Sequence, residues 1–249
     1  MAHDWLADEV PVQVSVNGQA FAVMMATPMD LEDFAWGFAV SEGLLADGAG
    51  IDDVRVREHF EGITLDIIAD ASERAQGERP MPGRSGCGIC GSRLLEDVVR
   101  QPEPVTGGPV VDDGAIERAL GMLRERQPMN IVSGAVHAAA WANEQGEISL
   151  VREDVGRHNA LDKLTGAMAR TSVDVSRGFA VVTSRASYEM VTKAASARIA
   201  ILVAISAPTA LAVQLAKSCE VTLVGFARPG RHVVYSGGQR VRRTQPRSR

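Results

Sequence analysis

The first 70 residues contain two stretches in which apolar and polar positions alternate, on either side of a stretch with helical spacing. Alternation on both sides of Asn17-Gly18 predicts a β-hairpin, because this dipeptide readily forms the turn that joins two antiparallel strands. A second alternating pair follows at residues 54–56 and 63–67. We therefore predict a hairpin–helix–hairpin part over residues 1–70, whose strands belong to a sheet that continues later in the chain.

The stretch between the two hairpins carries the signals of an amphipathic helix. Thr27-Pro28 is typical of a helix start, with threonine as the N-cap and proline in the first turn. Gly43 stands where a glycine commonly ends a helix. The apolar positions at helical spacing between them are Leu31, Phe34, Ala35 and Phe38.

From residue 135 onward the pattern changes to continuous apolar strands that alternate with helices. Strands that are apolar throughout are typical of a sheet covered on both faces, so we predict an α/β core domain over residues 93–237. An amphipathic helix ending before Pro128 precedes these strands. The predicted strands are 135–143, 148–151, 179–182, 199–205 and 221–224; the predicted helices are 188–197, 210–217 and one that carries Leu161, Leu164 and Met168.

Composition and targeting signals narrow the class of protein. The chain has 249 residues, of which 45% are hydrophobic and 23% charged, an ordinary balance for a soluble protein with a sizeable core. Residues 1–8 lack the features of a signal peptide, and the apolar-rich stretch 195–216 is interrupted by polar residues and a proline. We therefore expect a cytoplasmic protein with no membrane span and no nucleic-acid partner.

The C-terminal end is locally basic on a protein whose net charge is −5. The last acidic residue is Glu220, and seven arginines follow it. For Arg240 onward we favour a solubilising role, and we predict a basic C-terminal tail over residues 238–249.

A glycine-rich segment with two cysteines follows the predicted hairpins. Cys87 and Cys90 are three positions apart in the sequence GCGICG. Glycines directly precede and follow Cys87, and another glycine directly follows Cys90. Glycine permits positive φ and close approach of another molecule, so this segment is not a packed strand or helix. Because the preceding residues offer almost nothing to bury, we predict a flexible cysteine-bearing loop over residues 71–92 that presents a nucleophilic sulfur.

Several chemistries could use this cysteine pair. Zinc needs about four ligands, and a second Cys-x-x-Cys is absent, although His137 or His158 could complete a site. A zinc-dependent deaminase would need His-x-Glu and Pro-Cys-x-x-Cys, but His137-Ala138-Ala139 has no glutamate at the required place and Gly86 stands where the proline should be. A thioredoxin-like dithiol would stand at the start of a helix that follows a strand, whereas this pair follows a polar segment and is flanked by glycines. The remaining option is a thiolate that accepts sulfur as a persulfide and passes it on. The third cysteine, Cys219, lies in an apolar pattern and is expected to be a buried small residue.

Three successive strand ends carry hydroxyl or guanidinium groups. In open α/β sheets ligands bind beyond the carboxyl ends of the strands, where helix N-termini favour an anion. Arginine pairs with phosphate oxygens in a bidentate manner, and Arg157 and His158 could add to the same site. The alternative is ordinary helix capping with surface arginines; taken together, the three ends favour a phosphorylated ligand. These ends are Thr183–Ser187, Ser206–Thr209 and Phe226–Arg231.

The polar run Glu153–Lys163 (EDVGRHNALDK) is the most specific motif of the chain. With this run, the cysteine loop and the strand ends, the chain resembles the FdhD family of sulfur carrier and sulfurtransferase proteins over nearly its whole length. One departure is Ser133-Gly134-Ala135, where the family pattern has Thr-Gly-Gly before the histidine. The other matching motifs are Glu9-Val10-Pro11 with Asn17-Gly18, Thr27-Pro28, Gly37-Phe38, Ser41-Glu42-Gly43, the cysteine loop, Ser184-Arg185, Glu189-Met190, Ser206–Thr209, Gly225-Phe226 and Pro229-Gly230-Arg231.

The resemblance implies a fold, a reaction and partners. The fold is a three-layer, cytidine-deaminase-like α/β core with a mixed sheet, in a homodimer. The protein would receive sulfur from a cysteine desulfurase and pass it to molybdenum bound by two molybdopterin guanine dinucleotides, as formate dehydrogenase requires. This cofactor would be a bound substrate, and GDP would mimic its nucleotide end. Independently of the resemblance, we expect no zinc, because the third and fourth ligands are missing.

The same resemblance assigns residues to these roles. The persulfide would form on Cys87, the first cysteine of the loop, with Cys90 in an assisting role. The nucleotide contact would lie in the segment Phe226, Ala227, Arg228, Pro229, Gly230 and Arg231, and we add Ser184, Arg185, Thr209 and His158 to it. An alternative function is a non-catalytic chaperone that binds and delivers the molybdenum cofactor while the cysteines are structural or regulatory.

Overall fold

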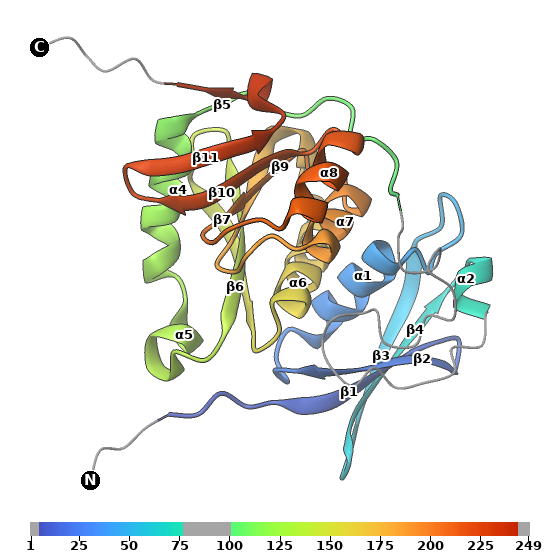
Figure 1. Cartoon of the computed structure of the whole chain (residues 1–249). Coiled ribbons are helices and arrows are strands. Elements are labelled where there is room, and N and C mark those ends of the chain that lie inside the picture. The colour runs from blue at the N-terminus through green and yellow to red at the C-terminus, as the bar shows by residue number, and fades with distance from the viewer. Residues whose placement is uncertain (1–4, 77–100, 244–249) are drawn as a thin grey trace, which may run out of the picture. The chain divides into compact units, whose positions relative to one another are not determined.

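The computed structural model describes residues 5–76 and 101–243, and these form two compact units (Figure 1). Unit 1 comprises the described residues of Met1–Arg100 together with Met129–His137 and Arg152–Val173. Unit 2 comprises Gln101–Pro128, Ala138–Val151 and the described residues of Asp174–Arg249. No helix within 5–76 or 101–243 is both long enough and apolar enough to cross a bilayer.

Unit 1 is built on a four-stranded sheet in the order β2-β1-β4-β3. Both predicted hairpins are present, and parallel pairing of β1 with β4 joins them. In the described part of the chain these four strands pair only with one another, so the expectation that they continue into a later sheet is wrong. The reason is that pairing of β1 with β4 joins the two hairpins into one sheet, and a single helix covers the apolar face of that sheet. The strands are β1 (Val10–Val16), β2 (Gln19–Ala26), β3 (Ile51–His59) and β4 (Gly62–Ala69).

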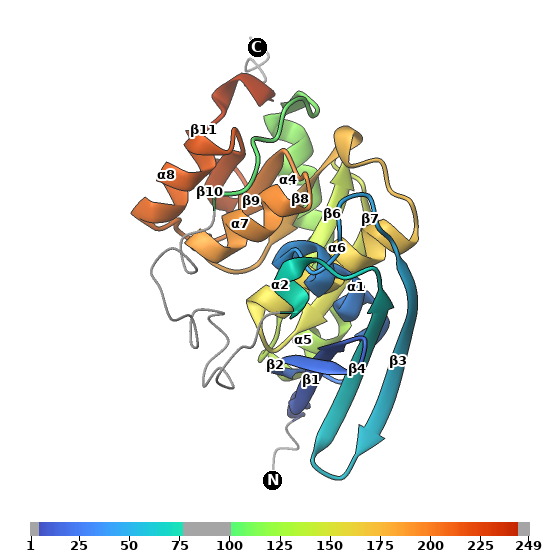
Figure 2. The ribbon, with the colours of Figure 1, turned by 90° about the vertical axis from the view of Figure 1, so that its right-hand side faces the viewer.

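Helix α1 (Leu31–Glu42) lies over one face of this sheet, as Figure 2 shows. Its rings of Phe34 and Phe38 contact each other in the apolar core of the unit. Gly43 ends the helix at φ 64°, as predicted, because glycine adopts this left-handed conformation without steric cost. The predicted start at Thr27-Pro28 is wrong: the N-cap is Asp30, since the backbone of Thr27 is bonded elsewhere in the unit.

Helix α6 (Arg157–Arg170) packs against α1 at very short range. A Cβ atom on Gly37 of α1 would overlap the carbonyl oxygen of Asp162, and a Cβ atom on Gly166 of α6 would overlap that of Asp33. The two helices thus approach each other through a glycine on each. The described residues of the unit also form two short helices, α2 (Glu73–Gln76) and α5 (Pro128–Ser133).

Unit 2 is built on a six-stranded sheet in the order β11-β10-β9-β8-β6-β7. The three central strands β8, β9 and β10 are parallel, while β11 and β6 pair with them antiparallel, so the sheet is mixed. Figure 1 shows α4 on one side of this sheet and α7 and α8 on the other. These three layers confirm the predicted α/β class. The strands are β6 (His137–Asn143), β7 (Ile148–Asp154), β8 (Gly178–Val182), β9 (Ile201–Ala204), β10 (Thr222–Arg228) and β11 (Arg231–Ser236); the helices are α4 (Asp113–Glu125), α7 (Tyr188–Ser196), α8 (Ala210–Ser218) and the 3₁₀ turn η1 (Val175–Arg177).

The described part of the predicted basic tail is folded into unit 2. Arg240 is only 7% exposed, and its guanidinium donates to the carbonyl oxygens of Val105, Gly107 and Glu220. The 3₁₀ turn η2 (Gly238–Arg240) carries it, and β12 (Val241–Arg242) then pairs with β5 (Val111–Asp112). A solubilising role is therefore wrong for Arg240, because its charge is satisfied by buried carbonyl groups.

The two units also divide the chain differently from the predicted segments. We assigned the whole of 93–237 to one core domain, yet α5 and α6 belong to unit 1. The sequence pattern does not reveal this, because the close approach of Gly37 and Gly166 joins residues far apart in the chain.

Candidate functional site

The run Glu153–Lys163, which was the most specific motif of the sequence, forms a buried polar network within unit 1. The ammonium group of Lys163 lies 2.7 Å from a carboxylate oxygen of Asp154, and both side chains are 0% exposed. Lys163 also donates to the carbonyl oxygen of Thr27, and the backbone N–H of Thr27 donates to Asp154. This network connects the end of β2 to α6 and explains why α1 begins late.

Other members of the run also bond to the backbone. The carboxylate of Glu153 accepts from the N–H groups of Met129 and Asn130, at 3.0 and 2.9 Å, where α5 begins. The amide of Asn159 donates to the carbonyl oxygen of Met25 and to Asp154. These contacts indicate that much of the run stabilises unit 1.

Three side chains that can carry positive charge lie near the N-terminus of α6: His137, Arg157 and His158. Burial lowers the pKa of His137 below its ordinary value, and the neighbouring charges of Arg157 and His158 lower it further. His158, which we predicted to bind the cofactor, is buried in unit 1. The other predicted cofactor-binding residues belong to unit 2.

In unit 2 the three predicted strand ends lie together, as expected from the parallel sheet. The N–H of Ser206 donates to the carbonyl oxygen of Ser184 at 3.4 Å, and the N–H of Thr209 donates to that of Ala186 at 3.0 Å. The N–H of Phe226 then donates to the carbonyl oxygen of Ser206 at 3.1 Å. We call these linked segments, residues 183–187, 206–209 and 225–226, the strand-end platform.

Phe226 has an unusual conformation within the platform. Its φ is 50°, in the left-handed region that is strained for a bulky residue, and its side chain is 38% exposed. A register irregularity between Gly225 and Arg228 imposes this backbone, and the bond to Ser206 holds it. The aromatic ring is therefore presented to solvent at the platform, where a nucleobase could stack on it.

The two predicted arginines lie at the tip of the hairpin that follows. Arg228 and Arg231 are direct antiparallel partners, so their side chains leave the same face of the hairpin. Gly230 makes the turn with φ 77°, and its N–H donates to the carboxylate of Glu117 on α4 at 3.2 Å. We call residues 228–231 the arginine hairpin. It is exposed, and its paired cations suit a pyrophosphate.

The helix N-termini at the platform differ in how they are capped. The hydroxyl of Thr209 accepts a hydrogen bond from the N–H of Ala212 at 3.2 Å and so caps α8. Helix capping is the alternative to ligand binding that the sequence left open for this residue. Ser187 is the N-cap of α7 but makes no capping bond, and its buried Oγ has no hydrogen-bond partner in the described part of the chain. Our sequence analysis did not single out Ser187; the helix start at Tyr188 is the signal that could have found it. The N–H groups in the first turn of α7 are therefore not capped by Ser187, although Glu189 places a carboxylate in the same turn.

The remaining predicted residues of the platform are present in different environments. The Oγ of Ser184 donates to the carbonyl oxygen of Arg185 at 3.0 Å, which buries the hydroxyl. The side chain of Arg185 is exposed.

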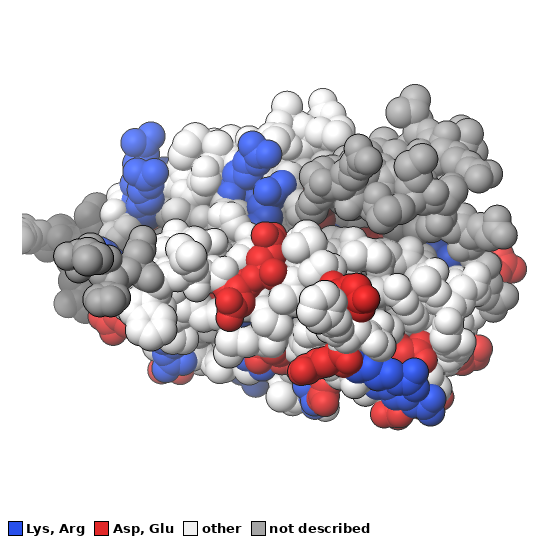
Figure 3. All heavy atoms as spheres, turned by 90° about the horizontal axis from the view of Figure 1, so that it is seen from below, with Lys and Arg blue, Asp and Glu red and all other residues white. Residues whose placement is uncertain are grey.

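Among the coloured atoms of Figure 3, basic side chains form small separate groups beside acidic ones. A phosphate site on such a surface depends on local groups of cations such as the arginine hairpin.

Cys87 and Cys90 lie outside the described residues, so their assignment stays a prediction. The third cysteine, Cys219, is 0% exposed, and burial raises the pKa of its thiol, which confirms that it is a buried small residue. In residues 5–76 and 101–243, no three His, Cys, Asp or Glu side chains are grouped as a metal site would require.

These features define a mixed α/β protein that gathers hydroxyl, guanidinium and aromatic groups at the ends of parallel strands. More particularly, the chain belongs to the FdhD/NarQ family, whose model matches residues 7–242. The resemblance seen in the sequence is thereby confirmed.

Similar proteins agree with this membership. The chain is 54% identical over 241 residues to the sulfur carrier protein FdhD of Xanthomonas euvesicatoria pv. vesicatoria, covering 96% of this chain and 86% of the relative. It is 49% identical over 244 residues to the sulfur carrier protein FdhD of Cupriavidus necator, covering 97% of this chain and 85% of the relative. A crystal structure of a protein described as a formate dehydrogenase accessory protein, from Desulfotalea psychrophila, matches with a TM-score of 0.76 at 25% identity. That match covers 96% of this chain and 91% of the other.

Proposed function

We propose that this protein is a sulfur carrier that serves formate dehydrogenase. It accepts sulfur on Cys87 from a cysteine desulfurase and passes it to molybdenum in the bis(molybdopterin guanine dinucleotide) cofactor. The observation that carries the proposal is the family match over residues 7–242, because this range includes both the cysteine pair and the strand-end platform. The names of the relatives, sulfur carrier protein and formate dehydrogenase accessory protein, support the same role.

The sulfur would move as a persulfide without an external oxidant. The thiolate of Cys87 attacks the outer sulfur of a persulfide on the desulfurase, the sulfur–sulfur bond of the donor breaks, and the donor leaves as a thiolate. A new sulfur–sulfur bond remains on Cys87. Cys90 assists by lowering the pKa of its neighbour or by resolving the persulfide. The step takes place in the cytoplasm, in a homodimer, and needs no zinc.

The substrate's nucleotide ends would be held in unit 2. The exposed ring of Phe226 offers a stacking surface for guanine, and Arg228 and Arg231 offer paired donors for the pyrophosphate. The N-terminus of α7 beside Ser187 adds N–H groups that favour an anion. GDP is the simplest compound that carries both groups, so it serves as the probe of this site.

The experiment that tests the sulfur-carrier role is intact mass spectrometry after incubation with a cysteine desulfurase and cysteine. The expected result is the addition of sulfur that a reductant removes. Cys87→Ala should abolish it, and Cys219→Ala is the matched control that should retain it, since that thiol is buried. An adduct that persists in Cys87→Ala would contradict the assignment.

Two further measurements on the Cys87→Ala variant, GDP binding and activation of formate dehydrogenase, separate the proposal from a non-catalytic cofactor chaperone. The platform and the arginine hairpin do not include the cysteines, so ligand binding alone could be the function. In that case Cys87→Ala protein would still bind GDP and would still activate formate dehydrogenase. A sulfur carrier requires that it bind GDP and fail to activate the enzyme.

A further inference from the structure

The arginine hairpin, residues 228–231, is exposed and is held by little strand pairing. A register irregularity follows Gly225, and beyond it Arg228–Arg231 is the single described pair of β10 with β11. Neither guanidinium group forms an ion pair or a hydrogen bond with a residue that the structure describes, so both can contact a ligand. The direction of these two side chains therefore depends on what fixes the turn between them.

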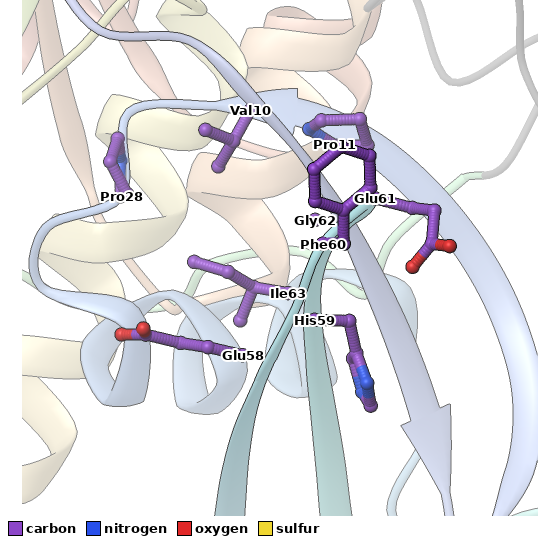
Figure 4. Close-up of a pocket in the computed structure, with 9 residues that line it drawn as sticks. All are labelled: Val10, Pro11, Pro28, Glu58, His59, Phe60, Glu61, Gly62 and Ile63. Carbon is purple, nitrogen blue, oxygen red and sulfur yellow. The ribbon is translucent and has the colours of Figure 1, made fainter.

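A pocket in unit 1 offers no alternative site for a pyrophosphate (Figure 4). The pocket has a volume of about 330 Å³ and lies at the end of the β3–β4 hairpin, where Phe60 forms part of its lining. Its charged lining residues are the glutamates Glu58 and Glu61, and none of the residues that line it is an arginine or a lysine. Carboxylates repel phosphate oxygens, so this pocket does not suit the nucleotide ends of the cofactor.

Glu117 on α4 makes a contact with the turn of the arginine hairpin. Its Oε1 accepts a hydrogen bond from the N–H of Gly230 at 3.2 Å. Gly230 has a φ of 77°, precedes Arg231 directly and lies two residues after Arg228. A hydrogen bond at this N–H therefore fixes the turn from which both guanidinium groups extend.

Helix α4 is itself firmly attached to unit 2, so Glu117 is a fixed point. One face of the helix is apolar and buried. Asp112 caps its N-terminus by accepting the N–H of Ala115 at 2.7 Å. The side chain of Arg118 donates to the carbonyl oxygen of Gln145 at 2.7 Å. The residues on either side of Glu117 thus hold the backbone that carries it.

The negative charge of Glu117 cannot be what favours an anion at the hairpin. A carboxylate near a bound pyrophosphate raises the energy of the complex, because charges of the same sign repel. A glutamine side chain would accept the same hydrogen bond from Gly230 without that charge. The acceptor oxygen is therefore the property of Glu117 that can help the hairpin to bind a ligand.

We propose that Glu117 is a positioning residue of the nucleotide site. By accepting the N–H of Gly230, it holds the arginine hairpin in the shape that receives a pyrophosphate. Holding the turn before the ligand arrives lowers the entropic cost of binding. Glu117 acts through Gly230 and does not contact the ligand. The inference rests on the proposed function, in which Arg228 and Arg231 bind the nucleotide ends of the cofactor.

The test is calorimetric titration of the full-length protein with GDP and, separately, with inorganic pyrophosphate. Glu117→Ala removes the acceptor and should weaken the binding of both ligands by about fivefold, the net effect of losing one hydrogen bond. Glu117→Gln keeps the acceptor and should bind both ligands at least as tightly as the unmodified protein does. Glu125→Ala is the matched control, because Glu125 is an exposed glutamate at the other end of α4, and it should leave both affinities unchanged.

Three results would overturn the positioning role. Glu117→Ala could bind GDP as tightly as the unmodified protein, which would show that the hydrogen bond does not matter. Glu117→Gln could lose as much affinity as Glu117→Ala, which would make the charge the important property. A loss for GDP without a loss for pyrophosphate would show that Glu117 contacts the base. If the unmodified protein binds neither ligand, the proposed nucleotide site itself fails, and the role of Glu117 with it.

Discussion

Lys163 lies at the centre of the buried network of unit 1, bonded to Asp154 and to the carbonyl oxygen of Thr27. Lys163→Met removes the cation and leaves the carboxylate of Asp154 buried without its partner. We expect a loss of about 3–5 kcal/mol in the free energy of unfolding, measured by urea denaturation. Arg177→Met is the control, because its pair with Glu144 is 3.7 Å apart and largely exposed, and it should cost less than about 1 kcal/mol. Equal losses in the two variants would contradict a structural role for the network.

His137 should make the stability of the protein depend on pH. Burial, followed by the charges of Arg157 and His158, lowers the pKa of His137 in the folded state below its ordinary value of 6.5. The unfolded chain therefore binds this proton first, so folding loses stability as pH falls below about 6.5, and the loss ends once the folded state is protonated too.

The measurement is the free energy of unfolding at steps from pH 7.5 to pH 5, compared between the unmodified protein and His137→Gln. Removing the titrating group should make the decline shallower over this range. A decline of the same slope in His137→Gln would show that other groups cause the pH dependence.

At the scale of elements, the contact of α1 with α6 depends on one glycine in each helix. Gly37→Ala and Gly166→Ala would each place a methyl group against a backbone carbonyl oxygen, which cannot move without separating the helices. We expect each substitution to cost about 1–3 kcal/mol or more in the free energy of unfolding. Gly121→Ala provides the matched control, since Gly121 is also helical, in α4, and has open space around it. That substitution should stabilise the protein by about 0.5–1 kcal/mol. A gain from all three alanines would show that the helices are not closely packed.

At the scale of the whole molecule, substrate binding and sulfur chemistry should be separable. Arg231→Ala should weaken GDP binding by about 1.5–3 kcal/mol, the range for a hydrogen bond to a charged group, while Cys87 still gains sulfur. Cys87→Ala should have the opposite effect. Calorimetric titration with GDP and intact mass spectrometry measure the two properties on the same samples. Arg55→Ala, an exposed arginine of β3 in unit 1, controls for the loss of one positive charge. GDP affinity that is unchanged when Arg228 and Arg231 are both replaced would place the site elsewhere.

The strand-end platform could be predicted because it depends on a local rule. Parallel strands end at the same edge, so loops that follow β8, β9 and β10 had to meet, and backbone hydrogen bonds join them. The conformation of Phe226 could not be predicted, because a positive φ in a phenylalanine is imposed by the irregular pairing of β10 with β11. The assignment of Cys87 and Cys90 stays a prediction.

By itself, the sequence determined the elements and their chemistry. Alternation and glycine placement determine the hairpins, the end of α1 and the strand–helix succession, because these depend on residues that are neighbours in the chain. It also determined the family, through motifs such as Glu153–Lys163.

Only the tertiary structure decided what those motifs do. It showed that Asp154 and Lys163 form a buried pair, that α6 belongs with α1, and that Arg240 is buried among carbonyl groups. It also left Phe60 exposed beside a mostly apolar pocket. The bond of Lys163 to Thr27, the packing of α6 on α1 and the burial of Arg240 against Val105 depend on contacts between segments far apart in the chain. Sequence spacing does not specify such contacts, because they depend on which faces the folded backbone brings within reach of one another.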